Sequence, residues 1–310
     1  MARIVVTGGA GFIGSHIVDA LLARKHDVYV LDDLSSGSRE NLEHVPQVVF
    51  HKVDIRSASA CDLLERLSPQ ILVHAAAQIS VRASMEQPQV DTDINVTGLV
   101  NMLSALREQR GAHVVFLSSG GAIYGEQVAF PANEDHPINP ESVYGLSKRV
   151  GEEYLDFWNK AWGVTSTSLR LSNVYGPRQN PHGEAGVVAI FAQHLLAKRG
   201  ITINGTGEQT RDFVYVEDVA EAVGRAVDSR ARGIFNIGTG RETPILEIAR
   251  MIRKGIAPDA PVEHAPAKGG EQMRSCIDNQ RARQRLEWNP KVQLSEGIER
   301  TVEWFRKSKR

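Results

Sequence analysis

A glycine-rich turn directly after an apolar run constrains the fold of this chain more than any other feature. Residues 4–6 form the run, and Gly8, Gly11 and Gly14 follow it in a GxxGxxG pattern. An amphipathic helical pattern over residues 13–21 begins inside the turn. Glycines at this spacing let the backbone approach a pyrophosphate, and the helix N-terminus favours an anion. The pattern therefore predicts a dinucleotide site on a parallel sheet, although an ordinary strand–helix turn also satisfies it.

Four more apolar runs of strand length follow, at 28–31, 48–50, 71–73 and 114–117. Nearly continuous apolar runs are typical of parallel strands buried on both faces, and helical patterns separate them here. This alternation predicts an α/β fold, a Rossmann-type doubly wound parallel sheet.

The pattern changes after residue 173, where a loop rich in Gly, Pro and Asn begins. Residues 212–216 and 234–237 look like further β-α-β material that returns to the first sheet, while the Pro- and Gly-rich segment 255–270 departs from it. We predict an NAD-binding domain from 1–173 plus about 212–240. A smaller, interleaved α/β substrate domain takes about 174–211 plus 241–310.

Composition excludes several classes of protein. The chain has 310 residues, 36 basic and 37 acidic, and its net charge of −1 offers no footprint for nucleic acid or an anionic membrane. No apolar stretch approaches the length of a membrane span, and the N-terminus lacks the layout of a secretion signal. The two cysteines, Cys61 and Cys276, form no disulfide framework, and the histidines show no metal-site spacing. We expect no metal and a cytoplasmic location.

An acidic residue identifies the preferred dinucleotide. Asp32 lies 18 residues after Gly14, at the end of the second run. A carboxylate there accepts hydrogen bonds from the ribose hydroxyls and repels a 2′-phosphate, and Asp33 adds to the repulsion. We therefore expect NAD rather than NADP.

Tyr144 and Lys148 are four residues apart, which puts both on one face of a helix. A free phenol has a pKa of about 10, and a neighbouring ammonium favours its ionised form. Ser118 and Ser119 end the fifth run, at the edge where open sheets bind ligands. These residues predict a proton-transfer site, although a Tyr–Lys pair also occurs by chance on surface helices.

A series of motifs occurs in order across nearly the whole chain: TGGAGFIGSH, LDDLSSG, the Asp54-Ile55 pair, HAAAQISV, SSGGAIYG, YGLSK, RLSNVYGPRQ and RDFVYVEDV. In these motifs the sequence resembles the extended short-chain dehydrogenase/reductase family. Within that family it resembles the UDP-hexose 4-epimerase group, whose members act on UDP-glucose or UDP-N-acetylglucosamine. The resemblance implies bound NAD, a UDP-sugar substrate and a homodimer formed through helices near 90–107 and 144–161.

The resemblance also implies roles for individual residues. Beyond those already named, the cofactor-binding residues are Phe12, Ile13, Ser36, Gly37, Asp54, Ile55, Ala75, Ala76, Ala77, Asn95 and Ser118. The substrate-binding residues are Ser80, Ser119, Tyr144, Asn173, Val187, Arg211, Lys268, Glu271 and Ser275. Asn95 supports the active-site lysine, Asn173 and Arg211 hold the pyrophosphate, and Glu271 contacts the uridine ribose.

Two positions depart from the family pattern. The position that carries a hydroxyl in many relatives is Gly120, so Ser119, or less favourably Ser118, supplies it here. Lys268 stands where many relatives carry arginine, and a lysine binds phosphate as a point charge rather than a fork.

The reaction follows from what the site lacks. Related dehydratases and decarboxylases need acidic groups beside the hydroxyl residue, where this chain has Gly120 and Gly121. We therefore expect 4-epimerisation, with Tyr144 as base. In the epimerase group the position of Ser275 borders the pocket for the 2-substituent of the hexose. With a small residue there, the resemblance implies room for an N-acetyl group and hence activity on UDP-N-acetylglucosamine and UDP-N-acetylgalactosamine.

Four alternatives remain: an epimerase of UDP-glucose and UDP-galactose only, a UDP-uronate 4-epimerase, an alcohol or sterol dehydrogenase, and a non-catalytic NAD sensor.

Overall fold

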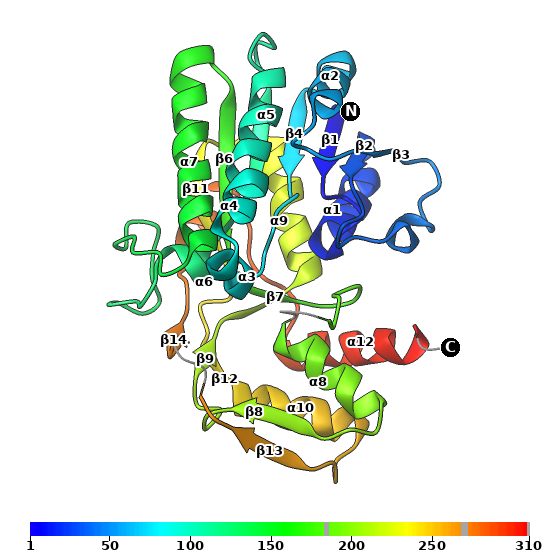
Figure 1. Cartoon of the computed structure of the whole chain (residues 1–310), viewed down its shortest axis with the longest axis vertical. Helices are drawn as coiled ribbons and strands as arrows, with labels where there is room; N and C mark the ends of the chain where they lie inside the picture. The colour runs from blue at the N-terminus through cyan, green and yellow to red at the C-terminus, as the bar shows by residue number, and fades with distance from the viewer. Residues whose placement is uncertain (183–185, 268–271, 309–310) are drawn as a thin grey trace.

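The computed structural model describes residues 1–182, 186–267 and 272–308. Figure 1 shows an upper lobe built on a large sheet and a smaller lower lobe. The large sheet has seven strands, all parallel, in the order β11-β6-β5-β4-β1-β2-β3. The strands are β1 (Arg3–Thr7), β2 (Asp27–Asp32), β3 (Val49–Lys52), β4 (Ile71–His74), β5 (His113–Ser119), β6 (Thr165–Leu171) and β11 (Gly233–Ile237).

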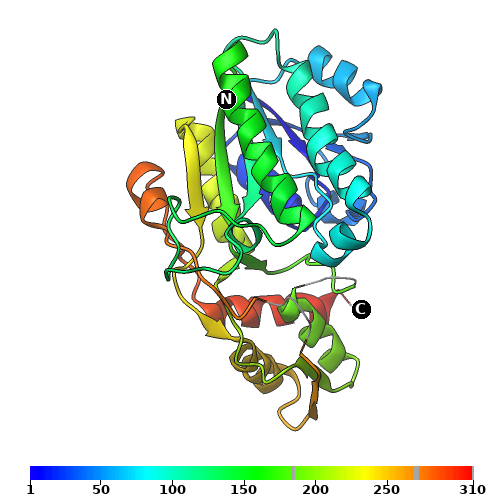
Figure 2. The same ribbon diagram turned by 60° about the vertical axis from the view of Figure 1, so that its left-hand side comes forward.

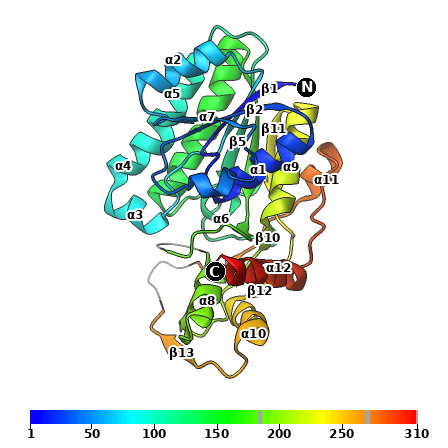
Figure 3. The ribbon, with the colours of Figure 1, turned by 90° about the vertical axis from the view of Figure 1, so that its right-hand side faces the viewer.

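Helices cover both faces of this sheet, and Figures 2 and 3 show the two helical layers on opposite sides of it. One layer holds α1 (Phe12–Ala23) and α9 (Val216–Ser229); the other holds α2 (Ala58–Leu67), α5 (Gly98–Ala105) and α7 (Val143–Trp162). Neighbouring strand residues are therefore buried on opposite faces, as Val5 and Val6 are. The predicted doubly wound α/β fold is confirmed.

The strand order reverses between β1 and β4, because the chain first builds outward to β3 and then returns to the other side of β1. Ligands of open parallel sheets bind outside the carboxyl ends of the strands at such a switch point. The glycine turn follows β1 and the segment 75–80 follows β4, so both lie at this crevice.

The lower lobe has its own apolar core. It packs α8 (Val187–Leu196), α10 (Ile245–Ile256) and α12 (Leu294–Lys307) with β8 (Ile201–Asn204) and β13 (Val262–Ala265). The segment 255–270, predicted to leave the first sheet, contributes β13, which pairs in parallel with β8. A further small sheet has the order β12-β9-β14, from β12 (Thr243–Pro244), β9 (Thr210–Arg211) and β14 (Arg274–Ser275).

Two features differ from the sequence prediction. Residues 212–216 were expected to return to the first sheet, but β10 (Phe213–Tyr215) pairs in parallel with β7 (Asn173–Tyr175) between the lobes. Only β11 joins the large sheet, beside β6. The sequence did not single out β6, because its residues TSTSLRL form no continuous apolar run.

Short helical segments complete the upper lobe: α3 (Val81–Glu86), α4 (Pro88–Thr92), a π-helical turn over Asp93–Thr97, and α6 (Gly120–Ile123). Near the C-terminus, α11 (Gln280–Arg285) packs beside β11. Within the described residues, no helix combines the length and apolar character needed to cross a membrane.

Candidate active site

The glycine turn after β1 is packed too tightly for larger side chains. Gly8 has a φ of +69°, and a Cβ placed on it would lie 2.7 Å from the backbone nitrogen of Ala76. A Cβ on Gly14 would overlap the carbonyl oxygen of Gly8. Only glycine permits this close approach of strand, turn and helix.

The first turn of α1 offers backbone donors to an anion. Gly11 caps the helix, so the N–H groups at Phe12 and Ile13 belong to the first turn, where an α-helix leaves its donors unpaired. Gly37 packs against the backbone of Ala10 at the same place. The residues present therefore fit a dinucleotide pyrophosphate.

Asp32 ends β2 beside this turn and is only 7% exposed. One of its carboxylate oxygens accepts a hydrogen bond from the N–H of Ala10 at 2.9 Å, and the other accepts from Leu34 at 2.8 Å. Each oxygen keeps a lone pair for a ribose hydroxyl. Burial raises the pKa of Asp32 above its ordinary value. Asp33 makes local contacts, since its carboxylate accepts from the backbone and hydroxyl of Ser35.

Other predicted cofactor residues lie around the crevice in different surroundings. Ala75, Ala76 and Ala77 follow β4 and are partly exposed, and Ser36 is exposed. Asp54 forms an ion pair with Arg56 at 2.6 Å, and Ile55 is buried against Gly98. In the structure, Asp54 thus contacts a neighbour in the chain, and Ile55 is part of the apolar core.

A cavity of about 350 Å³ opens at the carboxyl edge of the sheet. Its described lining residues are Val81, Ser119, Gly121, Ala122, Gly125, Glu141, Ser142, Tyr144, Ser172, Asn173, Arg211 and Gln272. The structure therefore brings together Ser119, Tyr144, Asn173 and Arg211, which come from four separate segments of the chain.

Tyr144 and Lys148 lie one turn apart on α7, at the N-terminal end that faces the cavity. Tyr144 and Ser119 both line the cavity, and the Ser119 hydroxyl is near enough to act on the phenol. The Nζ of Lys148 donates to the carbonyl of Leu117 at 2.9 Å and lies 5.8 Å from the centre of the Tyr144 ring.

The protonation of this pair differs from the sequence expectation. Burial raises the pKa of Tyr144 to about 12, and it lowers the pKa of Lys148 to about 8. The neighbouring Ser119 hydroxyl lowers the pKa of Tyr144, but burial outweighs this effect. In the protein without its cofactor, the ammonium of Lys148 therefore does not lower the pKa of Tyr144 to near neutral pH, because desolvation of the phenolate is the larger effect.

Ser118 and Ser119 point to opposite faces of β5. Ser118 donates to the carboxylate of Glu152 at 2.7 Å, inside the protein. Glu152 in turn pairs with Arg170 at 2.7 Å, and neither side chain is more than 2% exposed. Of these two serines, Ser119 lines the cavity and Ser118 does not.

Two further predicted residues, Asn95 and Ser80, are not among the described residues that line the cavity. Asn95 is buried and bonds to Gln78 and Asp91 rather than to Lys148 itself. Ser80 caps α3.

Among the predicted substrate residues, Val187 begins α8 and packs on the core of the lower lobe. Ser275 is buried in β14, in register with Arg211 on β9. Lys268 and Glu271 lie outside the described residues.

Sequence reasoning missed several residues that line the cavity. Glu141 and Ser142 directly precede the Tyr144 segment, Ser172 precedes Asn173, and Gln272 follows Glu271, so proximity in sequence was an available signal. Val81 follows Ser80, but nothing in its type indicated a site.

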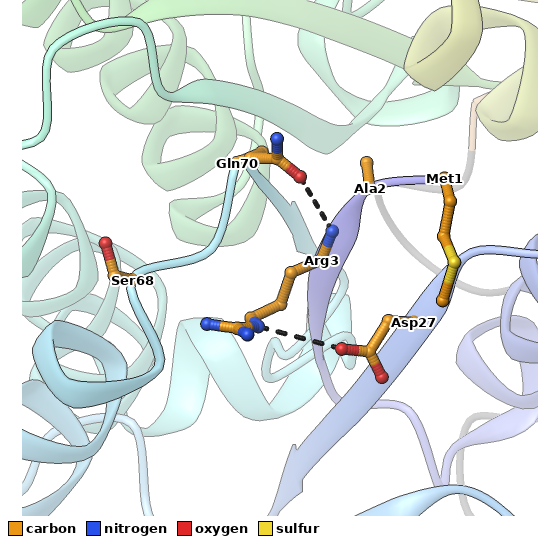
Figure 4. A pocket seen from close by; sticks show the side chains of 6 residues that line it. All are labelled: Met1, Ala2, Arg3, Asp27, Ser68 and Gln70. Atoms are coloured by element: carbon orange, nitrogen blue, oxygen red, sulfur yellow. Dashed lines mark hydrogen bonds and ion pairs between the residues drawn. The ribbon is translucent and has the colours of Figure 1, made fainter.

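A second hollow of about 400 Å³ lies at the opposite edge of the sheet, and Figure 4 shows its lining residues. They are Met1, Ala2, Arg3, Asp27, Ser68 and Gln70, at or near the starts of strands. None of the predicted site residues lies there.

Comparisons with known proteins agree with this geometry. A model of the NAD dependent epimerase/dehydratase family matches residues 4–238. A UDP-glucose 4-epimerase from Mycolicibacterium smegmatis is 47% identical over 98% of both chains. The crystal structure of a Thermotoga maritima UDP-glucose 4-epimerase with UDP-glucose has a TM-score of 0.95, at 40% identity, and covers 99% of this chain and 100% of its own. A UDP-N-acetylglucosamine 4-epimerase from Methanobrevibacter ruminantium, in complex with UDP-N-acetylmuramic acid, has a TM-score of 0.94, at 31% identity, over 99% of both chains.

The chain therefore belongs to the NAD-dependent epimerase/dehydratase family. Membership confirms the predicted extended short-chain dehydrogenase/reductase family, its UDP-hexose 4-epimerase group and its NAD cofactor. It also confirms the class of activity, that of an NAD-dependent nucleotide-sugar 4-epimerase.

Proposed function

We propose that this 4-epimerase interconverts UDP-N-acetylglucosamine and UDP-N-acetylgalactosamine as well as UDP-glucose and UDP-galactose. The observation that carries the proposal is the small side chain of Ser275. Residues in register on parallel strands face the same side of a sheet, so Ser275 shares the face of Arg211, one of the residues that line the cavity. A hydroxymethyl group there leaves volume for a 2-acetamido group that a tyrosine would fill.

In the proposed reaction, Tyr144 takes the proton from the 4-hydroxyl of the sugar and later returns it. Ser119 holds the same oxygen by a hydrogen bond, and Lys148 contributes positive charge beneath the phenol. Bound NAD supplies the hydride acceptor and a positive charge that offsets the burial of the phenolate. Because the hydride returns to the sugar, we expect NAD to stay bound between turnovers.

The pyrophosphate of the substrate is proposed to bind Asn173 and Arg211. Both line the cavity. Asn173 begins β7, which pairs with β10 between the lobes, and Arg211 ends β9, directly before β10 in the chain. Lys268 and Glu271 are proposed to complete the site at the phosphate and the uridine ribose.

Charge in the cavity favours a neutral hexose over a uronate. Among the described lining residues, Glu141 is the only carboxylate and Arg211 the only cation. The carboxylate of a uronate meets like charge at Glu141, and Arg211 is needed by the pyrophosphate. Gly120 and Gly121 carry no acid–base group, which disfavours dehydration.

The test is a comparison of turnover on the four UDP-sugars by the parent protein and by Ser275→Tyr. We expect the parent to turn over both pairs, and Ser275→Tyr to lose the acetylated pair through steric overlap while it keeps the other. Met273→Tyr is the matched control, because Met273 is two residues away and exposed. A parent that ignores acetylated sugars, or a tyrosine variant that handles them as well as the parent, excludes Ser275 as the determinant.

We also propose that the protein is a homodimer. Leu146 and Phe157 on α7, and Val90 on α4, are exposed large apolar residues on the predicted helices. Sedimentation of the parent and of Leu146→Glu tests this: a parent that sediments as a monomer contradicts it.

A further inference from the structure

Asp91 is a buried carboxylate for which the proposed reaction has no use. It lies on α4 and is 1% exposed. One carboxylate oxygen accepts hydrogen bonds from the side-chain amides of Gln78, at 2.8 Å, and Asn95, at 3.1 Å. The other oxygen has no hydrogen-bond partner among the described residues. Both partners are neutral, so no cation in hydrogen-bond contact compensates the charge, and an uncompensated buried charge is costly.

The helix that carries Asp91 packs against the catalytic helix α7. The negative charge of Asp91 acts on both Tyr144 and Lys148, and it raises the pKa of each. The Nζ of Lys148 donates to a backbone carbonyl, at Leu117, which does not neutralise the ammonium. Lys148 therefore depends on more distant carboxylates to stay charged in a buried site.

Two carboxylates act on Lys148, Asp91 from α4 and Glu152 from α7. Glu152 is already neutralised, because Arg170 pairs with it at 2.7 Å and Arg149 lies at 3.4 Å. His74, on β4, adds no charge, since burial lowers its pKa to about 3. Of these two carboxylates, Asp91 is thus the one that has no paired cation among the described residues.

Hydrogen bonds fix Asp91 relative to the start of α7. The Asn95 amide that donates to Asp91 also reaches the hydroxyl of Ser147 at 3.3 Å. Ser147 donates to the carbonyl of Tyr144 at 2.9 Å, and Ser84 accepts from the N–H of Tyr144 at 3.1 Å. A π-helical turn over 93–97 carries Asn95, and such turns are frequent at functional sites.

We propose that Asp91 is a positioning residue of this site, a buried counter-charge that keeps Lys148 in its ammonium form. The proposal rests on the proposed roles of Tyr144 and Lys148. Removing the charge of Asp91 lowers the pKa of Lys148 below its present value of about 8. The alkaline limb of the pH–rate profile then moves to lower pH, because Lys148 loses its proton earlier.

The experiment is a titration of Lys148 in the intact protein carrying ¹³C-labelled lysine, with the Lys148 signal assigned by its absence in Lys148→Met. In Asp91→Asn we expect the titration midpoint to fall by about one pH unit, as removal of one nearby charge does. We expect the alkaline limb of kcat against pH to move with it. Asp91→Ser is the second variant if the asparagine fails to fold, and thermal melting reports folding.

Two further variants separate charge from shape. Asp91→Glu keeps the charge and should hold the Lys148 midpoint at its parent value. Asp93→Asn is the matched control, because Asp93 lies two residues away, is exposed and pairs with Arg56 at 2.8 Å. This control should leave both the midpoint and the profile unchanged.

An unchanged Lys148 midpoint in folded Asp91→Asn or Asp91→Ser overturns the proposal. So does a loss of activity that is equal at every pH, because that is the result expected from a purely structural role. The titration needs no turnover, so a failure of the proposed UDP-sugar activity leaves this test standing and is recognised separately.

Discussion

The two ends of the large sheet carry hollows of similar size and very different chemistry. The cavity at the carboxyl edge measures about 350 Å³, and the hollow at the amino edge about 400 Å³ (Figure 4). At the carboxyl edge, Tyr144 and Lys148 have strongly shifted pKa values and glycines hold the backbone at close range. At the amino edge, Arg3 pairs with Asp27 at 3.6 Å, and both side chains remain well exposed.

The difference shows that size alone does not mark a site. The carboxyl edge lies at the reversal of strand order, where loops after several strands converge and bury polar groups together. Buried titratable groups with shifted pKa values are typical of functional sites. At the amino edge, the hollow is lined by residues at or near strand starts, and the side chains of its ion pair, Arg3 and Asp27, stay exposed to solvent.

Replacing Tyr144 by phenylalanine is the strongest test of the carboxyl edge. The fold should survive, because one hydroxyl at a cavity wall is lost. Turnover of UDP-sugars should fall about 10²–10⁴-fold or more, since the variant lacks the hydroxyl of the proposed base. Tyr154→Phe is the control on the same helix, where Tyr154 packs against Trp158. Near-parent kcat in Tyr144→Phe would mean that another group is the base.

Lys148→Ala should act in the same direction with a smaller effect, about 10²-fold in kcat near neutral pH. Loss of the nearby positive charge makes the phenolate of Tyr144 harder to form and so raises the pKa of the phenol. The pH optimum should move to higher pH. A pH–rate profile that keeps the parent's optimum contradicts the coupling between the two residues.

Asp32→Ala tests the cofactor end of the same edge. We expect NAD binding to weaken about tenfold, the effect of losing about 1.5 kcal/mol of charged hydrogen bonding, and discrimination against NADP to relax. Calorimetric titration with each dinucleotide measures both. Asp33→Ala should change less, since its carboxylate bonds to Ser35. Equal NAD affinity in the parent and Asp32→Ala would remove Asp32 from the ribose site.

Arg3→Ala at the amino edge should have the smallest effect. Exposed ion pairs contribute about 0–1 kcal/mol, so the free energy of unfolding should change by no more than about 1 kcal/mol. Activity on UDP-sugars should stay at the parent level, as measured by steady-state kinetics alongside urea unfolding. A tenfold loss of turnover would give the amino-edge hollow a role in function and end the contrast between the two edges.

Sequence patterns predicted the parts of this protein that depend on local order. Apolar runs identified β1, β2, β4 and β5, because strands buried on both faces must be apolar throughout. The run at 48–50 also indicated β3, although this edge strand has no fully buried residue. The spacing of Tyr144 and Lys148 placed both on one helical face. By contrast, β6 has no apolar run. The hydroxyls of Thr165 and Thr167 form hydrogen bonds with His113, at 2.8 and 2.9 Å. The strand therefore contains polar groups that are paired only in the folded state.

The tertiary structure determined which residues the predicted elements contact. The sequence alone left Ser118 and Ser119 open, and the pleat of β5 turns Ser119 to the cavity and Ser118 to Glu152. The sequence also indicated no role for Asp91, because its contacts with Gln78 and with α7 form only when these segments pack together. Periodicity reports which face of an element is buried, whereas the partners on that face, and with them the pKa values of the site, are set by contacts between residues far apart in the chain.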